Sequence, residues 1–352
     1  QYLIKAKGYA RASADFTVDE SSPADISVEL TPSRAWDGAA KEAPDGAGTQ
    51  AAPYQIESGE QLAWLADTVS AGSGTKICAV LTDDIDLGGF PFAPIGVSSH
   101  ELSGSFDGQG HTVSGLNVSA QYAGLFGVIK DAEIRNIVVQ GTVASTSSGS
   151  GDAGGIAGRA VGTTNVIENC GNEAVVNVIK SGGGYAGGIL GYAITSTTVT
   201  NCYNSSAVTS KGNTSYSRAS GIVGYLSGNG SAKITTCYNT GKVTSDGYAA
   251  GAFGGYGGPS LTVSDCYNTG SISNTNKSKA GAFTTSNSDT ATNSFYLKDS
   301  VPEGANTNGA TALTLAEMQS ALLSKLGTEN WTSVRGVNNS LPVLKWQKVS
   351  AP

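Results

Sequence analysis

The sequence predicts an all-β fold: a right-handed, single-stranded parallel β-helix of about eight coils, with a short capping helix at each end, preceded by the end of a β-sandwich-like domain. The first observation behind this prediction is a bracket of two glycines around two apolar residues. The bracket begins at Gly124, Gly155, Gly188, Gly221, Gly251 and, in a decayed form, Gly281, at intervals of 30 to 33 residues. A fixed period of this length indicates one small unit stacked repeatedly on itself.

The second observation is that four of the five cysteines share one repeat position, namely Cys170, Cys202, Cys237 and Cys266. They predict a column of small buried thiols inside a solenoid. The odd count argues against a complete disulfide framework, and no Cys-x-x-Cys spacing points to zinc. The third observation is that each repeat holds three short β-rich runs, separated by Gly, Asn and Ser corners. Because crossovers between parallel strands are strongly right-handed, we expect a right-handed coil.

The N-terminal part divides into three segments. Residues 1–33 lie outside the repeat, and the runs that start at Tyr2 and Ile26 predict the last strands of a partial β-sandwich. Residues 34–53, rich in Ala, Gly and Pro, predict a linker. Over residues 54–76 a capping box and an apolar stripe at helical spacing predict an N-terminal capping helix. Such a helix would cover the open end of the first coil.

Residues 77–310 form the predicted β-helix, and residues 311–352 a C-terminal helix and closing strand. The helix starts at a second capping box, at Thr314. Short polar residues precede the Ile/Cys position of four repeats: Asn136, Asn169, Asn201 and Asp265. We expect them in corners, each bonded to its neighbour one coil away.

The composition excludes several classes of function. A net charge of −7 without a basic cluster predicts no nucleic-acid binding. No apolar run approaches the roughly 20 residues of a membrane span, so we expect no direct membrane insertion. The chain begins at Gln1 rather than Met, which predicts a piece of a larger multidomain chain.

Residues suited to catalysis are scarce. Between residues 141 and 290 there are six Asp or Glu and no His, so we assign no catalytic residue and no cofactor. The densest acidic group is Asp83, Asp84 and Asp86. Close to it in sequence are His100, Glu101, Asp107 and His111. This group could build a calcium site or a carboxylate pair, but Asp at a strand-to-corner transition is also an ordinary structural choice, so we assign no metal.

An aromatic column is the better binding candidate. Tyr203, Tyr238 and Tyr267 each follow a column cysteine and should stack on consecutive coils. If the cysteines point inward, alternation along the strand points the tyrosines outward. With Asn204, Asn239 and Asn268 beside them, they could bind a sugar or a protein. The other interpretation, which we favour, is that the rings only stabilise the sheet.

Several segments of the chain resemble the GLUG-motif repeat proteins of bacterial surfaces. The matching segments, besides the glycine brackets, are 84–87, 92–96, 106–116 and 341–346. Such repeats occur in adhesin-like proteins and beside the peptidase unit of IgA-cleaving metalloproteases. The resemblance implies a β-helix used as a stalk, a display surface or a recognition module. The His-Glu-x-x-His of the peptidase is absent from this chain.

These observations favour a non-catalytic module of a secreted or cell-surface bacterial protein. It would act as an adhesin, a spacer or a recognition surface for a host protein or glycan. Two alternatives stay open. One is a carbohydrate-active β-helix enzyme or glycan-binding module, and the other is the substrate-recognition arm of a larger surface protease.

Overall fold

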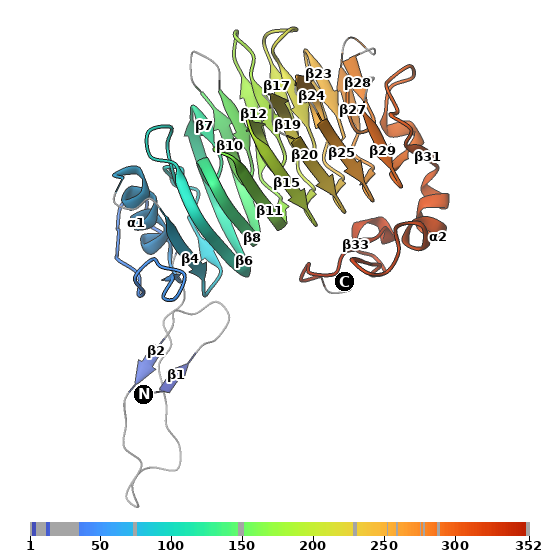
Figure 1. The fold of residues 1–352 in the computed structure, drawn as a ribbon. Helices are drawn as coiled ribbons and strands as arrows, with labels where there is room; N and C mark the ends of the chain where they lie inside the picture. The colour runs from blue at the N-terminus through green and yellow to red at the C-terminus, as the bar shows by residue number, and fades with distance from the viewer. Residues whose placement is uncertain are drawn as a thin grey trace, which may run out of the picture.

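The protein is a parallel β-solenoid (Figure 1). The computed structural model describes residues 35–72, 76–146, 151–227, 231–251, 253–257, 260–274, 276, 279–286 and 289–349, and two short strands near the N-terminus. Those strands, β1 (Tyr2–Ile4) and β2 (Ala12–Ala14), pair antiparallel. The strand expected from Ile26 lies outside the described residues. The β-sandwich and the domain boundaries stay predictions.

Three consecutive turns, within residues 185–211, 218–245 and 248–274, each contribute five short strands rather than the expected three. In the turns before them, some of these strands are joined into longer ones. Equivalent strands pair in parallel from turn to turn and form five ladders. The first ladder has one strand from each of six turns: β7 (Tyr122–Ala123), β9 (Asp152–Gly154), β13 (Tyr185–Gly187), β18 (Arg218–Ser220), β23 (Tyr248–Ala250) and β28 (Ala280–Gly281). The second ladder contains the start of β8 (Phe126–Ser145), β10 (Ala157–Val161), β14 (Leu190–Ala193), β19 (Val223–Ser227) and β24 (Phe253–Gly257).

The third ladder is the longest and extends beyond the regular turns toward the N-terminus. It contains β3 (Tyr54–Ile56), β4 (Ile77–Leu81), β6 (Leu102–Ala120), the middle of β8, β11 (Thr164–Asn172), β15 (Ser196–Thr200), β20 (Ser231–Thr235), β25 (Ser260–Ser264) and β29 (Thr290–Thr292). The long strands β6, β8 and β11 bend around corners and take part in more than one ladder.

The fourth and fifth ladders complete the turn. The fourth contains β5 (Ile85–Asp86), parts of β6 and β8, the end of β11, β16 (Tyr203–Asn204), β21 (Tyr238–Asn239), β26 (Tyr267–Asn268), β30 (Phe295–Leu297) and β31 (Thr311–Leu313). The fifth contains the ends of β6 and β8, β12 (Val175–Ile179), β17 (Val208–Lys211), β22 (Val243–Ser245) and β27 (Ile272–Asn274).

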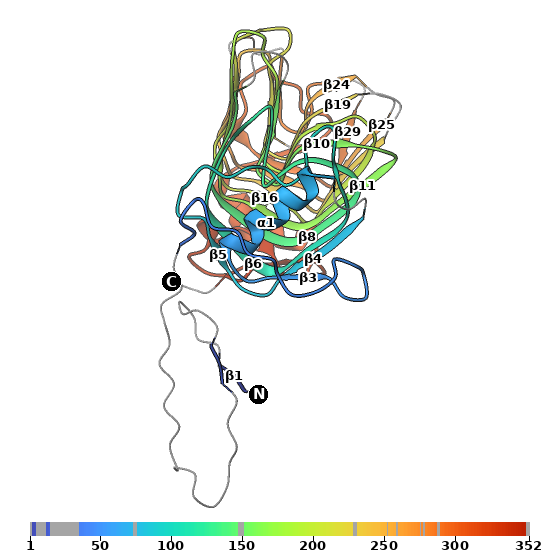
Figure 2. The same cartoon turned by 90° about the vertical axis from the view of Figure 1, so that its left-hand side faces the viewer.

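The glycine brackets lie where the first ladder turns into the second, and there the coil folds inward. Viewed along the solenoid (Figure 2), β10, β19 and β24 belong to one arm of the coil, and a second arm stands beside it. The inward fold between the two arms, with the first and second ladders as its walls, is called the notch below. Its floor leaves no room for a side chain: a β-carbon on Gly188 would lie 2.0 Å from the carbonyl oxygen of Gly221. One prediction is corrected, because Gly281 pairs with Ala250 rather than with Gly251, the bracket glycine.

A ladder of buried asparagines crosses the interior behind the brackets. It consists of Asn172, Asn204, Asn239 and Asn268, each at most 1% exposed. Each of the first three donates its side-chain amide to the side-chain oxygen of the next, at 2.7, 2.7 and 2.8 Å. Each of the four also donates to a backbone carbonyl two residues on. This satisfies buried polar groups that would otherwise cost stability.

The predicted corner column is confirmed. Asn136, Asn169, Asn201 and Asp265 all have left-handed backbone conformations, with φ between 52° and 56°. Thr236, at 55°, occupies the same corner. The expected bonding between coils is present in part of the column. The Asn169 amide donates to the Asn136 side-chain oxygen at 2.9 Å, whereas the buried side-chain oxygen of Asn201 has no hydrogen-bond partner. Asn and Asp tolerate this conformation better than other non-glycine residues.

The cysteine column is confirmed as well. Cys170, Cys202, Cys237 and Cys266 are free thiols, at most 1% exposed, in the main core. The backbone N–H of Cys237 donates to the Sγ of Cys266 at 3.4 Å, which places the two on adjacent coils. Cys78 is a partly buried free thiol at a different position of the fold.

The two helices differ in what they cover. α1 (Gly59–Ser70) starts at Ser58, whose hydroxyl accepts from the N–H of Gln61 at 3.3 Å, and its buried residues include Leu62 and Leu65 in the main core. It therefore covers the N-terminal end as predicted. α2 (Leu315–Leu326) has the predicted capping box at Thr314. Its buried side chains, Met318 and Leu322, belong to a second apolar cluster rather than to the main core.

That second cluster is completed by the C-terminal segment. It contains two short antiparallel strands, β32 (Trp331–Thr332) and β33 (Val343–Leu344). Two 3-10 turns, Lys298–Ser300 and Asn338–Ser340, lie between the last ladders and the end of the chain. Figure 1 shows this segment lying under the last turns, close to α2.

Candidate functional site

The predicted tyrosine column exists. Tyr203, Tyr238 and Tyr267 pair in register on consecutive turns. The ring centroids of the first two lie 5.3 Å apart and those of the last two 5.0 Å apart, with nearly parallel planes. The column is not a surface stripe, however, because none of the three is more than 4% exposed.

The C-terminal segment covers these rings. Trp331 packs on Tyr238 and Tyr267, with centroids 6.1 and 5.4 Å away, and Trp346 packs on Tyr203 at 5.8 Å. The Trp346 indole N–H also donates to the carbonyl oxygen of Asn201 at 2.8 Å. The segment therefore seals the outer face of the fourth ladder.

The hydroxyls of the tyrosines are paired too. Tyr203 donates to Glu173 at 2.6 Å and Tyr238 to the side-chain oxygen of Gln347 at 3.1 Å. Tyr267 donates to the Pro342 carbonyl oxygen. Burial raises the pKa of all three hydroxyls above the usual range.

The expected exposure of the six proposed ligand-binding residues is therefore wrong, for two reasons. The tyrosines point outward as predicted, but a distant segment of the chain covers them. Asn204, Asn239 and Asn268 follow the tyrosines directly, so strand alternation turns them inward like the cysteines. They are buried in the asparagine ladder. A ligand could reach these residues only if the C-terminal segment moved away.

The acidic group near the N-terminal end does not form one site. The Asp84 carboxylate accepts from His111 at 3.1 Å and from the N–H of Thr112 at 2.9 Å. Its pKa is lowered, since these bonds outweigh partial burial. Asp86 accepts instead from the N–H of Gly88, at 2.8 Å. Asp83 bonds the N–H of Asp84. Among the described residues, no three His, Cys, Asp or Glu side chains lie close enough together to hold a metal ion.

Asp107, His100 and Glu101 lie on a different part of the surface. A groove of about 800 Å³ crosses the outer face of β4, β6, β8 and β11, and Asp107 is one of its lining residues. A hollow of about 660 Å³ lined by His100 and Glu101 adjoins it, since Lys76 and Asp131 line both. We call the two together the groove.

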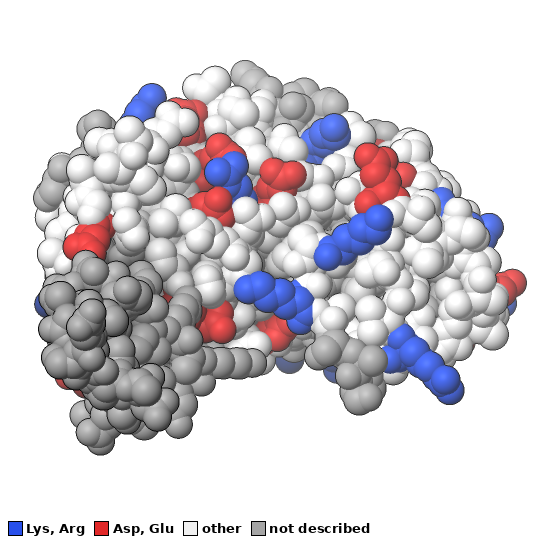
Figure 3. Space-filling model, turned by 90° about the horizontal axis from the view of Figure 1, so that it is seen from below, with Lys and Arg blue, Asp and Glu red and all other residues white. Residues whose placement is uncertain are grey.

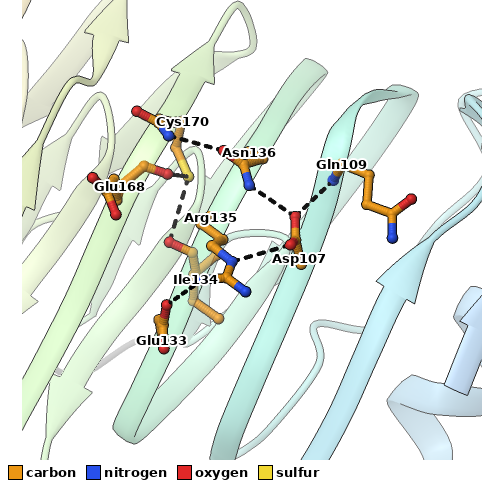
Figure 4. A network of polar contacts seen from close by, with 9 residues as sticks. Asp107, Gln109, Glu133, Ile134, Arg135, Asn136, Glu168 and Cys170 are labelled. Atoms are coloured by element: carbon orange, nitrogen blue, oxygen red, sulfur yellow. Dashed lines mark hydrogen bonds and ion pairs between the residues drawn. The ribbon is translucent and has the colours of Figure 1, made fainter. Parts of the chain in front are cut away.

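A fixed network of charges lines the groove (Figure 4). The Asp107 carboxylate accepts from the N–H of Gln109 at 2.9 Å, from the Asn136 amide at 2.9 Å and from Arg135 Nε at 3.0 Å. Arg135 Nη1 donates to Glu133 at 2.8 Å. Because Asn136 belongs to the corner column, the network is anchored to the solenoid itself.

Both carboxylates of this network have hydrogen-bond donors. The Asp107 carboxylate has three, and Arg135 joins it to Glu133. The side chains of Arg135 and Glu133 are 43% and 46% exposed, so the network is accessible from the solvent.

Charged side chains of both signs lie on the face seen from below (Figure 3). Lys and Arg alternate there with Asp and Glu as scattered side chains. No single-sign patch gathers there. The groove was missed in the sequence because its lining residues are spread from residue 49 to residue 166. The available sequence signal was that Glu133 and Arg135, two residues apart on one strand, lie on the same face. Their partner Asp107, however, lies 28 residues before Arg135.

A solved structure with a similar fold comes from Bacteroides ovatus, a protein provisionally named immunoglobulin A1 protease. The two align with a TM-score of 0.65 over 85% of this chain and 94% of that one. Their sequences are 20% identical, so the likeness concerns the fold alone. No protein-family model matches the chain.

Two curated relatives match part of the sequence. Halomucin of Haloquadratum walsbyi is 31% identical over 144 residues, which are 38% of this chain and 2% of halomucin. A protein of Evansella cellulosilytica, provisionally named a Gly-rich membrane protein, is 31% identical over 134 residues, 35% of this chain and 15% of that protein. The chain thus spans a small fraction of either relative. Within its described residues, no helix has the length and apolar character that crossing a membrane requires.

Proposed function

We propose that the chain is a non-catalytic recognition module of a secreted or cell-surface bacterial protein and that it belongs with the GLUG-motif repeats. The observation that carries the proposal is the state of the groove charges. Asp107, Glu133 and Arg135 are bonded to one another and to the corner column, on a face of regular parallel strands. Side chains held in this way suit the recognition of a host protein or a glycan, as an adhesin requires.

The comparisons support the cellular setting of this proposal. One relative is named a Gly-rich membrane protein and another halomucin, which favours a place at the cell surface. The small fraction of each relative that the chain spans favours a module within a larger protein. The name of the structural neighbour adds one alternative, a substrate-recognition arm of a surface protease.

The test is a screen that separates binding from cleavage. The purified protein is incubated with a panel of polysaccharides and with immunoglobulin A1, and both retention of the ligand and its breakdown are measured. We expect retention without breakdown. Cleavage that disappears when one carboxylate, Asp107 or Glu133, is changed to its amide would overturn the non-catalytic assignment.

Groove variants then locate the contact. Arg135→Gln removes the cation that joins the two carboxylates, and it should weaken retention of the ligand about tenfold. Arg335→Gln, an exposed position in the C-terminal segment, is the matched control. Equal retention by both variants would exclude the groove as the contact surface.

A further inference from the structure

Two columns of side chains face each other across the notch, and neither is part of the groove. The column on the first ladder alternates aromatic and charged residues: Tyr122, Asp152, Tyr185, Arg218 and Tyr248, with Lys279 beside the last ring. The column on the second ladder holds Arg159, Tyr192 and Tyr225. Ring centroids of Tyr185 and Tyr192, from opposite walls, lie 4.9 Å apart.

One half of the notch is electrically compensated. Arg159 lies over the rings of Tyr122 and Tyr192, at 4.0 and 5.0 Å, and its Nη2 lies 2.7 Å from the carboxylate of Asp152. Asp152 is fully buried, and its second oxygen has no hydrogen-bond partner. The pair thus acts as an internal part of the fold, with no charge left over for a ligand.

The other half carries positive charge without an acidic partner. The guanidinium of Arg218 lies 4.4 Å from the Tyr225 ring and 5.0 Å from the Tyr248 ring, and its buried Nε has no hydrogen-bond partner. Lys279 Nζ lies 4.9 Å from the same Tyr248 ring. Among the ion pairs that the described part of the chain forms, none includes Arg218 or Lys279.

An exposed aromatic ring stands at the rim above these cations. Arg218 Nη1 donates to the Ser215 carbonyl oxygen at 3.3 Å and Lys279 Nζ to that of Thr214 at 3.1 Å. Both bonds hold the loop that presents Tyr216, which is 60% exposed. The nearby acid, Asp246, is engaged by the N–H of Gly212 at 2.9 Å.

We propose that this half of the notch, formed by Tyr216, Arg218, Tyr225, Tyr248 and Lys279, binds an anionic glycan. All of these side chains except the more exposed Tyr216 are partly exposed. Arg218 and Lys279 receive the carboxylate or sulfate groups, and the tyrosine rings offer flat faces to the sugar rings. Charge complementarity selects an anionic chain, and the repeated rings select a glycan over a simple anion.

The experiment measures binding of the purified protein to polygalacturonate, chondroitin sulfate and neutral dextran by titration calorimetry. We expect binding to one or both polyanions, weakening as salt rises, and none to dextran. The two polyanions separate carboxylate from sulfate recognition. The double variant Arg218→Gln with Lys279→Gln should bind at least about tenfold more weakly.

A matched control and a surface variant complete the test. Lys242→Gln makes the same charge change at an exposed position of the fifth-ladder edge and should bind like the unchanged protein. Tyr216→Ala alters an exposed ring, so it should keep the fold while weakening binding several-fold. Equal binding by the double variant and the control, or no binding to any polyanion, overturns the inference. Neither result would contradict ligand binding at the groove, which the Arg135→Gln variant tests separately.

Discussion

Gly188 lies directly against the side chain of Asn204. A β-carbon on Gly188 would sit 2.5 Å from Asn204 Cγ as well as 2.0 Å from the Gly221 carbonyl oxygen. Gly221 stands in the same relation to Asn239, and Gly251 to Asn268. In these three brackets the first glycine is therefore required by the asparagine ladder and the next coil, not by a positive φ. The glycine brackets and the asparagine ladder thus form one packing arrangement that is repeated along the solenoid.

Gly188→Ala should accordingly be strongly destabilising. The new methyl group meets a backbone oxygen of the next coil and the buried Asn204 amide, which is held by hydrogen bonds, so we expect a loss of about 3 kcal/mol in the free energy of unfolding. Urea denaturation followed by circular dichroism measures it. Gly182→Ala is the control, because a β-carbon there meets nothing within 4 Å. A loss below about 0.5 kcal/mol for Gly188→Ala would contradict the packing described here.

The thiol column should be chemically silent in the folded protein. All four column thiols are at most 1% exposed, so a reagent in solution cannot reach them while the protein stays folded. Burial also raises the pKa of the Cys202 and Cys266 thiols, which disfavours the reactive thiolate there. An aromatic disulfide reagent should therefore modify the partly exposed Cys78 first and the four column cysteines only in denaturant. Cys78→Ser should remove the fast phase. Fast modification of two or more thiols in the native protein would show that the column opens.

The period of the brackets was enough to predict the solenoid, because identical residues at a fixed interval must occupy equivalent places on stacked coils. Register then followed for the cysteines and for the corner residues Asn136 and Asn169. Strand parity was the weak step. The prediction that Cys202 points inward and Tyr203 outward was right. The same alternation turns Asn204 inward, but the sequence interpretation placed Asn204 on the outside beside the tyrosine.

The repeat pattern could not predict contacts between segments that lie far apart in the sequence. Trp346 covers Tyr203, and its indole reaches Asn201 across 145 residues of sequence. Nothing in a local repeat encodes such a contact. The notch was missed for a different reason: successive positions in its first column are Asp152, Tyr185 and Arg218, which are not alike. A search for recurring residue types passes over a column that alternates.

Asp152 should make stability fall as pH rises through the mildly acidic range. Burial raises its pKa from 3.8 to about 6, although Arg159 opposes the shift. Between these two values the folded protein holds a proton that the unfolded chain has lost, so the free energy of unfolding decreases with rising pH. The full effect is at most about 3 kcal/mol, and it is complete above pH 6.

The variant Asp152→Asn isolates this contribution. Carboxylates with lowered pKa, such as Asp84 and Asp131, act in the opposite sense and lose stability as pH falls. Urea unfolding of both proteins from pH 4 to 8 therefore has to be compared as a difference. The free energy of unfolding of the unchanged protein minus that of the variant should fall as pH rises from about 4 to 6 and stay constant above this range. A constant difference would show that the carboxylate titrates normally.

Trp331→Ala tests whether the C-terminal segment holds the tyrosine column closed. Trp331 is 1% exposed and packs on Tyr238 and Tyr267, so its removal should cost about 3–5 kcal/mol of unfolding free energy. Leu315→Ala, at a 42% exposed position on α2, should change little and serves as the control. Urea denaturation gives the stability, and acrylamide quenching of tyrosine fluorescence reports the exposure of the rings. If the column has only a structural role, uncovering it lowers stability and creates no affinity for sugars. A gain of glycan binding in Trp331→Ala would instead return Tyr238 and Tyr267 to the list of ligand contacts.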